Sequence, residues 1–435
     1  MERYFHSVTL DADKCCGCTN CIKRCPTEAI RVRNGKAQII SERCIDCGEC
    51  IRVCPHHAKK AKSDPLSIIE NKKYKIAIPA PALFGQFNNL DDIDVVLTGL
   101  KEMGFDHVFE VSRGAELVSE ATRRLMAEGK LQRPVISSAC PAVVRLIRVR
   151  FPDLCAHVLP MDSPMEITAR LAKKEAVEKT GLPMEEIGAY FITPCAAKVT
   201  DVKEPIGSGR SWVDGAISIS EIFPKLSHVM DKLEQIEPIG CSGLIGVSWA
   251  GSGGEAAALL NEKYLAADGV ENIIRVLEEL EDERLRELDF VELNACSGGC
   301  VGGVLTVENA YVAKARLQRL RKYLPVSCNH LEKDFLPKMM WTDELEFAPV
   351  LNLSNDLEEA MRMMEEIDRI CAELPGLDCG SCGAPSCRAL AEDMVRGEAR
   401  KSDCIFVLRE QIQDMASTLS SMGGFIPKHH TEEEP

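Results

Sequence analysis

Cysteines are the residues of this chain whose type and spacing predict chemistry. There are 21 among 435 residues, and their uneven placement does not suit a disulfide scaffold. Two N-terminal runs share the spacing C-x2-C-x2-C-x3-C-P. In such a doubled run, three close thiolates bind one [4Fe–4S] cluster and the fourth binds the other cluster. One predicted ligand set is therefore Cys15, Cys18, Cys21 and Cys54, and the other is Cys44, Cys47, Cys50 and Cys25.

Structural zinc is the alternative for these runs. Zinc sites use two C-x2-C pairs or combine cysteine with histidine, so the doubled run of four, each ending in proline, favours iron–sulfur clusters. The arrangement resembles the two-cluster ferredoxin domains of bacteria, which relay single electrons.

A third motif lies near the C-terminus. Its spacing is C-x2-C-x4-C-x16-C, and its members are Cys379, Cys382, Cys387 and Cys404. Glycines and Pro385 predict a tight ligand loop, and a predicted helix over residues 388–399 carries the chain back to the last cysteine. The motif resembles the single-cluster domain of corrinoid iron–sulfur proteins. We expect a third [4Fe–4S] cluster here, with zinc again as the alternative.

The composition is that of a globular protein of about three domains. Hydrophobic residues make up 45% and charged residues 27% of the chain. The net charge of −15 argues against a nucleic-acid partner, because such proteins carry a basic face. Because no apolar run approaches the ~18 residues of a membrane span and the start lacks the apolar core of a secretion signal, we expect a cytoplasmic protein without a membrane partner.

The middle of the chain predicts alternating strands and helices. Residues 75–80, 106–111, 134–137, 188–193 and 289–295 look like strands, and residues 90–104 and 114–130 have apolar residues at helical spacing. Cys140, Cys195 and Cys296 each come just after a strand, and Cys300 follows in a glycine-rich turn. The carboxyl ends of parallel strands form the usual ligand edge of α/β sheets. Four thiolates gathered there could hold a further cubane, although a lone cysteine beside a strand is more often a small buried hydrophobe.

We therefore expect an α/β protein of three modules. Residues 1–65 would form a ferredoxin-like α+β domain with two clusters, and residues 72–350 a parallel α/β domain. Residues 351–435 would form a small helical iron–sulfur domain. Its tail places Ile405, Leu408, Ile412, Met415 and Leu419 at helical spacing, which predicts either a helix packed on its own domain or one that docks a partner or a second copy. No role is assigned to Cys16, Cys155, Cys241, Cys328 and Cys371.

Three segments of the middle domain carry a family resemblance. SSACPAV, TPCAAK and NACSGGC, in this order behind a two-cluster module, resemble the signature segments of iron-only ([FeFe]) hydrogenases. The resemblance implies that Cys140, Cys195, Cys296 and Cys300 bind the cubane of the H-cluster. It also implies that Cys300 bridges to a two-iron subcluster carrying CO, cyanide and a bridging dithiolate amine.

The same resemblance implies roles for other residues. Lys198 would donate to one cyanide, and the segment at Pro81 and Ala82 would serve the other, although Ala82 lacks the hydroxyl of the family serine. Ala139 stands where efficient members have a proton-passing cysteine. Glu120 matches a relay glutamate, but Arg123 occupies the next relay position. These departures resemble the sensory branch of the family and predict slow turnover.

Two functions follow as expectations. The first is a slow hydrogenase that interconverts H2 with protons and electrons and senses H2 or redox state. Its partners would be a redox protein such as ferredoxin, hydrogenase maturation proteins and a signalling protein, or a second copy in a homodimer. The alternative is a non-catalytic protein that binds cubanes only and acts in electron transfer or cluster assembly.

Overall fold

The computed structural model describes residues 5–332 and 334–422, and these fall into two compact units. Unit 1 comprises residues 1–14 and 41–350, and unit 2 comprises residues 15–40 and 351–435. The first cysteine run thus belongs to the same unit as the C-terminal motif. The module limits predicted at residues 65, 72 and 350 were set by sequence motifs. The two units are instead defined by which parts of the chain pack together.

Unit 1 contains two parallel sheets and one antiparallel strand pair. The first sheet has the order β6-β5-β8-β9, and the second has the order β10-β11-β7. Strands β1 and β4 form the antiparallel pair. Their bounds are β1 Val8–Leu10, β4 Lys59–Ala61, β5 Tyr74–Pro79, β6 His107–Val108, β7 Val135–Ile136, β8 Ile187–Thr193, β9 Gly215–Ser218, β10 Tyr264–Asp268 and β11 Phe290–Asn294. The predicted parallel α/β architecture is confirmed, with two sheets in this unit.

Helices connect and cover these strands. Their bounds are α2 Glu49–Arg52, α3 Ile93–Glu102, α4 Val111–Glu128, α5 Pro141–Arg150, α6 Pro164–Thr180, α7 Ala196–Lys203, α8 Ile219–Met230, α9 Leu244–Ser248, α10 Gly254–Ala258, α11 Val270–Glu281 and α12 Ala310–Leu320. Helix α3 begins later than the apolar spacing suggests, because the Asp92 side chain accepts a hydrogen bond from the Asp94 amide and caps the helix there.

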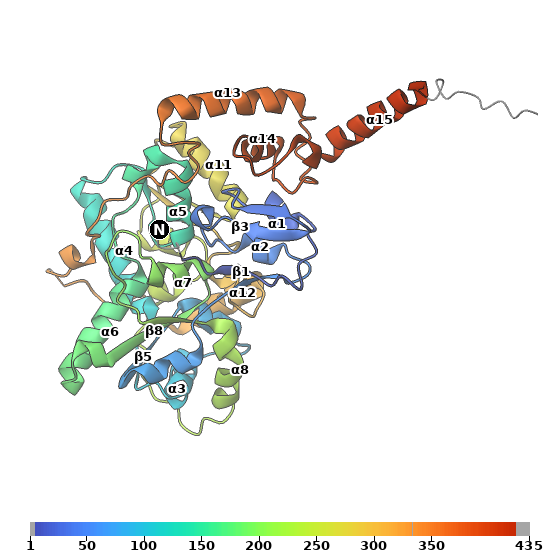
Figure 1. Cartoon of the computed structure of the whole chain (residues 1–435). Coiled ribbons are helices and arrows are strands. Elements are labelled where there is room, and N and C mark those ends of the chain that lie inside the picture. Colours follow the sequence, from blue (N-terminus) through green and yellow to red (C-terminus); the bar gives the residue numbers. More distant parts are fainter. Residues whose placement is uncertain (1–4, 333, 423–435) are drawn as a thin grey trace, which may run out of the picture. The chain divides into compact units, whose positions relative to one another are not determined.

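The first sheet is buried on both faces. Ala77 of β5 packs into a core with α3 and α8, whereas its neighbours Ile76 and Ile78 pack into a second core with α6. Successive side chains of a strand point to opposite faces, so one short apolar strand supplies both cores. Figure 1 shows β5 and β8 between α6 and the pair α3 and α8.

Unit 2 combines a small hairpin with helices. Its elements are α1 Asn20–Lys23, β2 Ile30–Arg33, β3 Lys36–Ile39, α13 Leu357–Glu373, α14 Cys387–Val395 and α15 Ile405–Met422. Ile367 and Ile370 of α13 pack with Leu390 and Ala391 of α14. The C-terminal region is thus helical, as expected.

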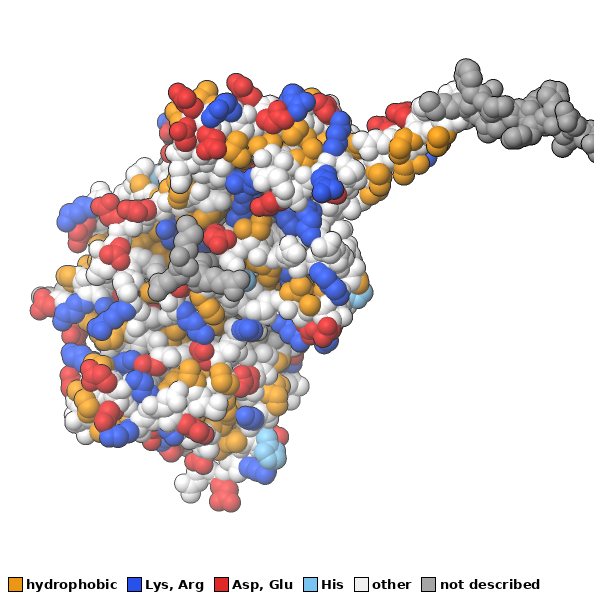
Figure 2. Space-filling view, in the orientation of Figure 1, with side chains coloured by type: hydrophobic (Ala, Val, Ile, Leu, Met, Phe, Trp, Pro, Cys, Tyr) orange, Lys and Arg blue, Asp and Glu red, His pale blue; other side chains and the backbone are white. Residues whose placement is uncertain are grey.

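Helix α15 carries an exposed row of apolar side chains, which Figure 2 shows in orange. We call it the α15 row, and it consists of Ile405, Leu408, Ile412, Met415 and Leu419. Across the described parts of the chain, no helix is both long enough and apolar enough to span a bilayer.

Candidate functional site

One cavity of about 100 Å³ in unit 1 collects the residues that the signature segments contain. It lies where four parallel strands end. Pro81 follows β5, Ala139 and Cys140 follow β7, Cys195 follows β8, and Cys296 and Cys300 follow β11. Lys198 of α7 also lines it. Segments that are far apart in the sequence therefore place four cysteines around one space, at the ligand edge typical of parallel sheets.

The local structure explains how the cysteines reach the cavity. Cys140 and Cys195 stand immediately before α5 and α7, where the free amides of a helix start favour a thiolate. The segment around Cys300 depends on glycine. Gly299 has a φ of +90°, and a Cβ there would lie 2.4 Å from the Ser252 nitrogen. A Cβ on Gly303 would lie 2.0 Å from the Pro194 carbonyl oxygen, so neither position accepts a side chain.

Burial and the neighbouring thiols suppress the ionisation of Cys195 and Cys300. Burial raises the pKa of Cys195 well above its ordinary value, and Cys296, Cys140 and Cys300 raise it further. Burial, followed by Cys140 and Cys296, raises the pKa of Cys300 to about 12. Gathered thiolates in an apolar cavity need a bound cation to compensate their charge. The donor set and its gathering around one cavity therefore fit an iron–sulfur cubane.

Lys198 and Pro81 line this cavity, but Ala82 does not. The Lys198 side chain is 13% exposed, and its Nζ lies 3.1 Å from Asp201 Oδ2. An ammonium group at the cavity wall can donate to a buried anionic acceptor, as the cyanide role requires. Ala82 is fully buried, and its carbonyl oxygen accepts a hydrogen bond from Gln86 Nε2.

The two predicted proton-relay positions have different locations. Ala139 lines the cavity, at the position where efficient family members have a cysteine. Glu120 is not part of the cavity wall. It accepts a hydrogen bond from the Leu331 amide at 2.9 Å and pairs with Arg124. Burial raises the pKa of Glu120, but these partners outweigh it and lower the pKa overall. Arg123 donates to the Ala258 carbonyl.

Sequence reasoning missed two buried carboxylates in the cavity wall. Glu255 and Glu292 are 4% and 3% exposed, and both line the cavity. Ser137 Oγ donates to Glu255 Oε2 at 2.6 Å and accepts from the Ala139 amide at 3.1 Å. A hydrogen-bonded path therefore runs from the alanine at the relay position to Glu255. The available signal was a glutamate at position 292, within an otherwise apolar strand.

The two carboxylates have unequal surroundings. Glu292 accepts hydrogen bonds from the amides of Gly253 and Ala256 and from Asn294 Nδ2, at 2.8–2.9 Å. Glu255 has one hydroxyl partner, and burial and the neighbouring Glu292 raise its pKa well above the ordinary value. Burial raises the pKa of Glu292 as well, but its three donors favour the charged form. We infer that Glu255 holds a proton and Glu292 the charge, an arrangement that suits proton transfer.

The remaining predicted ligands are divided between the two units. Cys44, Cys47, Cys50 and Cys54 belong to unit 1, and Cys15, Cys18, Cys21 and Cys25 to unit 2. Each crossed ligand set draws on both units, so that assignment stays a prediction. The two runs nevertheless repeat one local geometry. The sulfurs of Cys25 and Cys54 each accept a hydrogen bond from the amide four residues later, at 3.2 and 3.3 Å.

Three parts of the chain match known protein families. Residues 73–264 and 252–304 match the iron only hydrogenase large subunit, C-terminal domain, which covers more than half of the chain. The chain belongs to the iron-only hydrogenase family. Residues 7–55 match a 4Fe-4S dicluster domain, and residues 374–406 match an Fe-S cluster family. The protein is therefore an iron–sulfur protein with a ferredoxin-like N-terminal module, as the motifs predict.

The relatives include enzymes and assembly factors. Iron hydrogenase 1 of Clostridium pasteurianum is 26% identical over 68% of this chain and 64% of its own length. The NADP-reducing hydrogenase subunit HndD of Solidesulfovibrio fructosivorans is 24% identical over 46% of this chain and 35% of its own. The cytosolic Fe-S cluster assembly factor NAR1 of Scheffersomyces stipitis is 28% identical over 34% of this chain and 29% of its own. The iron-only hydrogenase homologue described here thus spans about a third to two-thirds of the curated relatives it matches.

A solved structure supports the fold. It is an [FeFe]-hydrogenase structure that reveals stepwise H-cluster assembly, and it aligns with a TM-score of 0.50 at 17% identity. The alignment covers 66% of this chain and 97% of the other. At this identity the likeness concerns the fold alone, and it agrees with the parallel sheets of unit 1.

Proposed function

We propose that this protein is an [FeFe]-hydrogenase that interconverts H2 with two protons and two electrons at an H-cluster. The observation that carries the proposal is the convergence of Cys140, Cys195, Cys296, Cys300 and Lys198 on one cavity. When bound, the H-cluster supplies the metal and the base at which H2 is cleaved heterolytically. The thiolates would hold its cubane, and Cys300 would bridge to its two-iron part.

The cavity walls perform the remaining tasks. Lys198 would donate to an anionic ligand of the two-iron part, and Pro81 contributes to a cavity wall that excludes water. Glu255, protonated beside the charged Glu292, exchanges its proton with Ser137 Oγ at 2.6 Å. Glu292 accepts a hydrogen bond from the Gly253 amide, and Gly253 also lines a second pocket. The loop that contains Gly253 is the proposed exit for protons.

We further propose slow turnover and a role in sensing H2 or redox state. The Ala139 methyl group can neither give nor accept a proton, so the first proton transfer has to cross the space that a cysteine thiol would fill. A slow enzyme still reports H2 through the redox state of its clusters, which a signalling partner would read. Electrons would pass through the cysteine-bound cubanes to a ferredoxin-like carrier, in a cytoplasmic setting where maturation proteins insert the two-iron part.

The second candidate is a cubane-only protein of electron transfer or cluster assembly. The specific observation for it is the match to proteins described as cytosolic Fe-S cluster assembly factors. The loss of the relay cysteine at Ala139 suits it too. Retention of four cysteines around one cavity suits both candidates, whereas Lys198 at the cavity wall favours the hydrogenase.

Infrared spectroscopy separates the two functions. The protein would be produced anaerobically together with the hydrogenase maturation proteins, and its iron would be counted. Sharp CO and cyanide bands with about 18 iron atoms per chain, for four cubanes and a two-iron part, are the expected result. Absence of the bands with about 16 iron atoms would instead establish the cubane-only protein and remove the hydrogenase proposal.

A further inference from the structure

The C-terminal cysteine motif is built onto the first cysteine run, within unit 2. Gly383, which follows Cys382, accepts a hydrogen bond at its carbonyl oxygen from the Val32 amide at 2.8 Å. A Cβ on Gly383, whose φ is +84°, would lie 1.9 Å from the Val32 carbonyl oxygen. The ligand loop therefore lies directly against strand β2, and only glycine permits so close an approach.

The hairpin continues this connection to the first cysteine run. Val32 stands opposite Ala37 in the ladder of β2 and β3. The Ala37 amide lies 3.4 Å from Cys15 Sγ and donates to it, and Lys36 Nζ donates to the Cys15 carbonyl oxygen at 2.7 Å. A path of backbone and hydrogen bonds thus runs from the Cys382 loop to a sulfur of the first run, across two strands.

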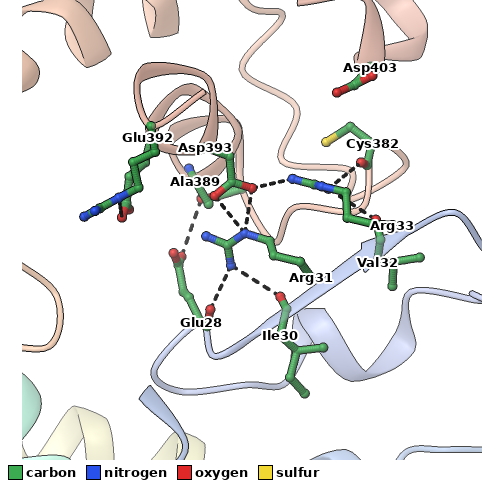
Figure 3. A network of polar contacts seen from close by, with 12 residues as sticks. Glu28, Ile30, Arg31, Val32, Arg33, Cys382, Ala389, Glu392, Asp393 and Asp403 are labelled. Carbon is green, nitrogen blue, oxygen red and sulfur yellow. Dashed lines mark hydrogen bonds and ion pairs between the residues drawn. The ribbon is translucent and has the colours of Figure 1, made fainter. Parts of the chain in front are cut away.

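A buried ionic clamp holds the two motifs together (Figure 3). Asp393 of α14 accepts two hydrogen bonds from Arg31 Nε, at 2.8 and 3.0 Å, and pairs with Arg33. The side chains of Arg31 and Asp393 are 5% and 3% exposed. Arg33 also donates to the Cys382 carbonyl oxygen at 3.1 Å. The clamp thus joins β2 to the helix that begins at Cys387 and to the loop that carries Cys382.

A second contact lies beside Cys21. Lys23 Nζ donates to the Pro385 carbonyl oxygen at 3.2 Å, and a Cβ on Gly380 would lie 3.4 Å from Ile22 Cδ1. Helix α1, which contains Cys21, therefore contacts the loop between Cys379 and Cys387. The ligand-bearing segments of both motifs touch at two places.

The C-terminal cysteines fit a cluster by their own chemistry. Cys382 and Cys387 are partly buried and pack against the hydrophobic core of this module. Cys404 is buried and belongs to the hydrophobic core of this module. Three of the four cysteines therefore meet at one core, and thiolates gathered there would need a bound cation to compensate their charge.

We propose that the C-terminal motif and the first cysteine run form one electron-transfer unit. The step is transfer of one electron from the reduced cluster on Cys379, Cys382, Cys387 and Cys404 to the oxidised cluster held by Cys15, Cys18 and Cys21. The first cluster is oxidised from 1+ to 2+, the second is reduced from 2+ to 1+, and no proton or atom moves. A low-potential one-electron carrier supplies the electron. Asp393 acts as a positioning residue that keeps the two clusters in electronic contact.

Electron paramagnetic resonance tests this inference without any hydrogenase activity. The full chain would be produced without the maturation proteins, loaded with iron and sulfide, and reduced with dithionite. The signal lost in Cys382→Ala identifies the C-terminal cluster. In the wild type we expect this signal to be broadened by a neighbouring reduced cluster and to resist microwave saturation.

Three variants decide the outcome. Asp393→Asn keeps every cysteine and should sharpen the C-terminal signal, which then saturates at lower power. Cys18→Ala, which removes a ligand of the neighbouring cluster, should have the same effect if Asp393→Asn fails to fold. Asp368→Asn, which removes an exposed ion pair with Arg388 in the same unit, is the control and should leave the signal unchanged.

Two results would overturn the inference. One is a C-terminal signal with the same width and saturation in the wild type, Asp393→Asn and Cys18→Ala. The other is a Cys382→Ala protein that loses no signal, because the C-terminal motif would then hold no reducible cluster. Neither readout involves the two-iron part, so failure of the proposed hydrogenase function would leave this test intact.

Discussion

Replacement of Glu255 by glutamine tests the proton path most directly. Glutamine has nearly the same shape as glutamate and keeps an oxygen that can accept a hydrogen bond from Ser137 Oγ. In the wild type this hydrogen bond joins Ser137 Oγ to Glu255 Oε2 at 2.6 Å. The glutamine side chain cannot take up or release a proton.

The size of the effect follows from the role of the residue. A positioned acid or base typically contributes about 10²–10⁴-fold to a rate. Glu255 lines the cavity, bonds to Ser137 Oγ and is 4% exposed, so bulk water offers little alternative. We therefore expect Glu255→Gln to lower H2-dependent viologen reduction by about 10²-fold or more, equal to about 2.7 kcal/mol in the barrier.

The assay needs two controls. The CO and cyanide bands of the variant should match those of the wild type, which shows that the site is loaded. Glu287→Gln, at an exposed carboxylate of the same unit, should leave the rate within about twofold. A Glu255→Gln protein with intact bands and near wild-type turnover would refute the assignment of the proton path.

Four further predictions follow. Ala139→Cys should speed proton transfer and raise turnover, and unchanged proton-transfer kinetics would count against the alanine as the cause of slow turnover. Lys198→Ala should weaken retention of the two-iron part about tenfold, seen as weaker infrared bands at constant cubane iron, because one charge-assisted hydrogen bond is lost. Burial raises the pKa of Glu166 from 4.5 to about 7, so the folded state binds its proton more tightly. This contribution to the free energy of unfolding is complete below pH 4.5 and is lost as the pH rises to about 7. Over that range the wild type should lose roughly 3 kcal/mol of stability relative to Glu166→Gln. Thermal unfolding of the two proteins with the same pH profile would refute this. The α15 row repeats at spacings of three and four, the seam of a coiled coil, so we expect two copies to pair through it. Ile412→Asp with Leu419→Asp should abolish the dimer in sedimentation analysis, whereas a monomeric wild type would contradict the pairing.

Local signals in the sequence predicted most of what is local in the protein. The predicted strand over residues 188–193 is β8, Ile187–Thr193, because an uninterrupted apolar run suits a strand buried on both faces. The sequence also predicted that Cys140, Cys195 and Cys296 follow strands, because turn residues and proline mark where strands end. These cysteines line one cavity in the structure, at the carboxyl ends of their strands, where the geometry of parallel sheets predicts a ligand site.

Other features depend on contacts between distant segments. Glu120 matched the family relay by its neighbours in sequence, yet it bonds to the Leu331 amide, 211 residues away. Glu255 and Ser137 are 118 residues apart, and nothing near either of them in the chain marks the pair.

The sequence by itself therefore determined which cysteines have the spacing of iron–sulfur ligands and which elements precede them, since spacing and periodicity are properties of the local chain. Only the tertiary structure decided what surrounds those residues. It brought Glu255 into hydrogen-bond contact with Ser137, whose hydroxyl oxygen also accepts from the Ala139 amide. It also paired Arg31 with Asp393, 362 residues apart in the chain. The physical reason is that burial and buried charge pairs depend on how elements pack, and the same motif can pack against different partners.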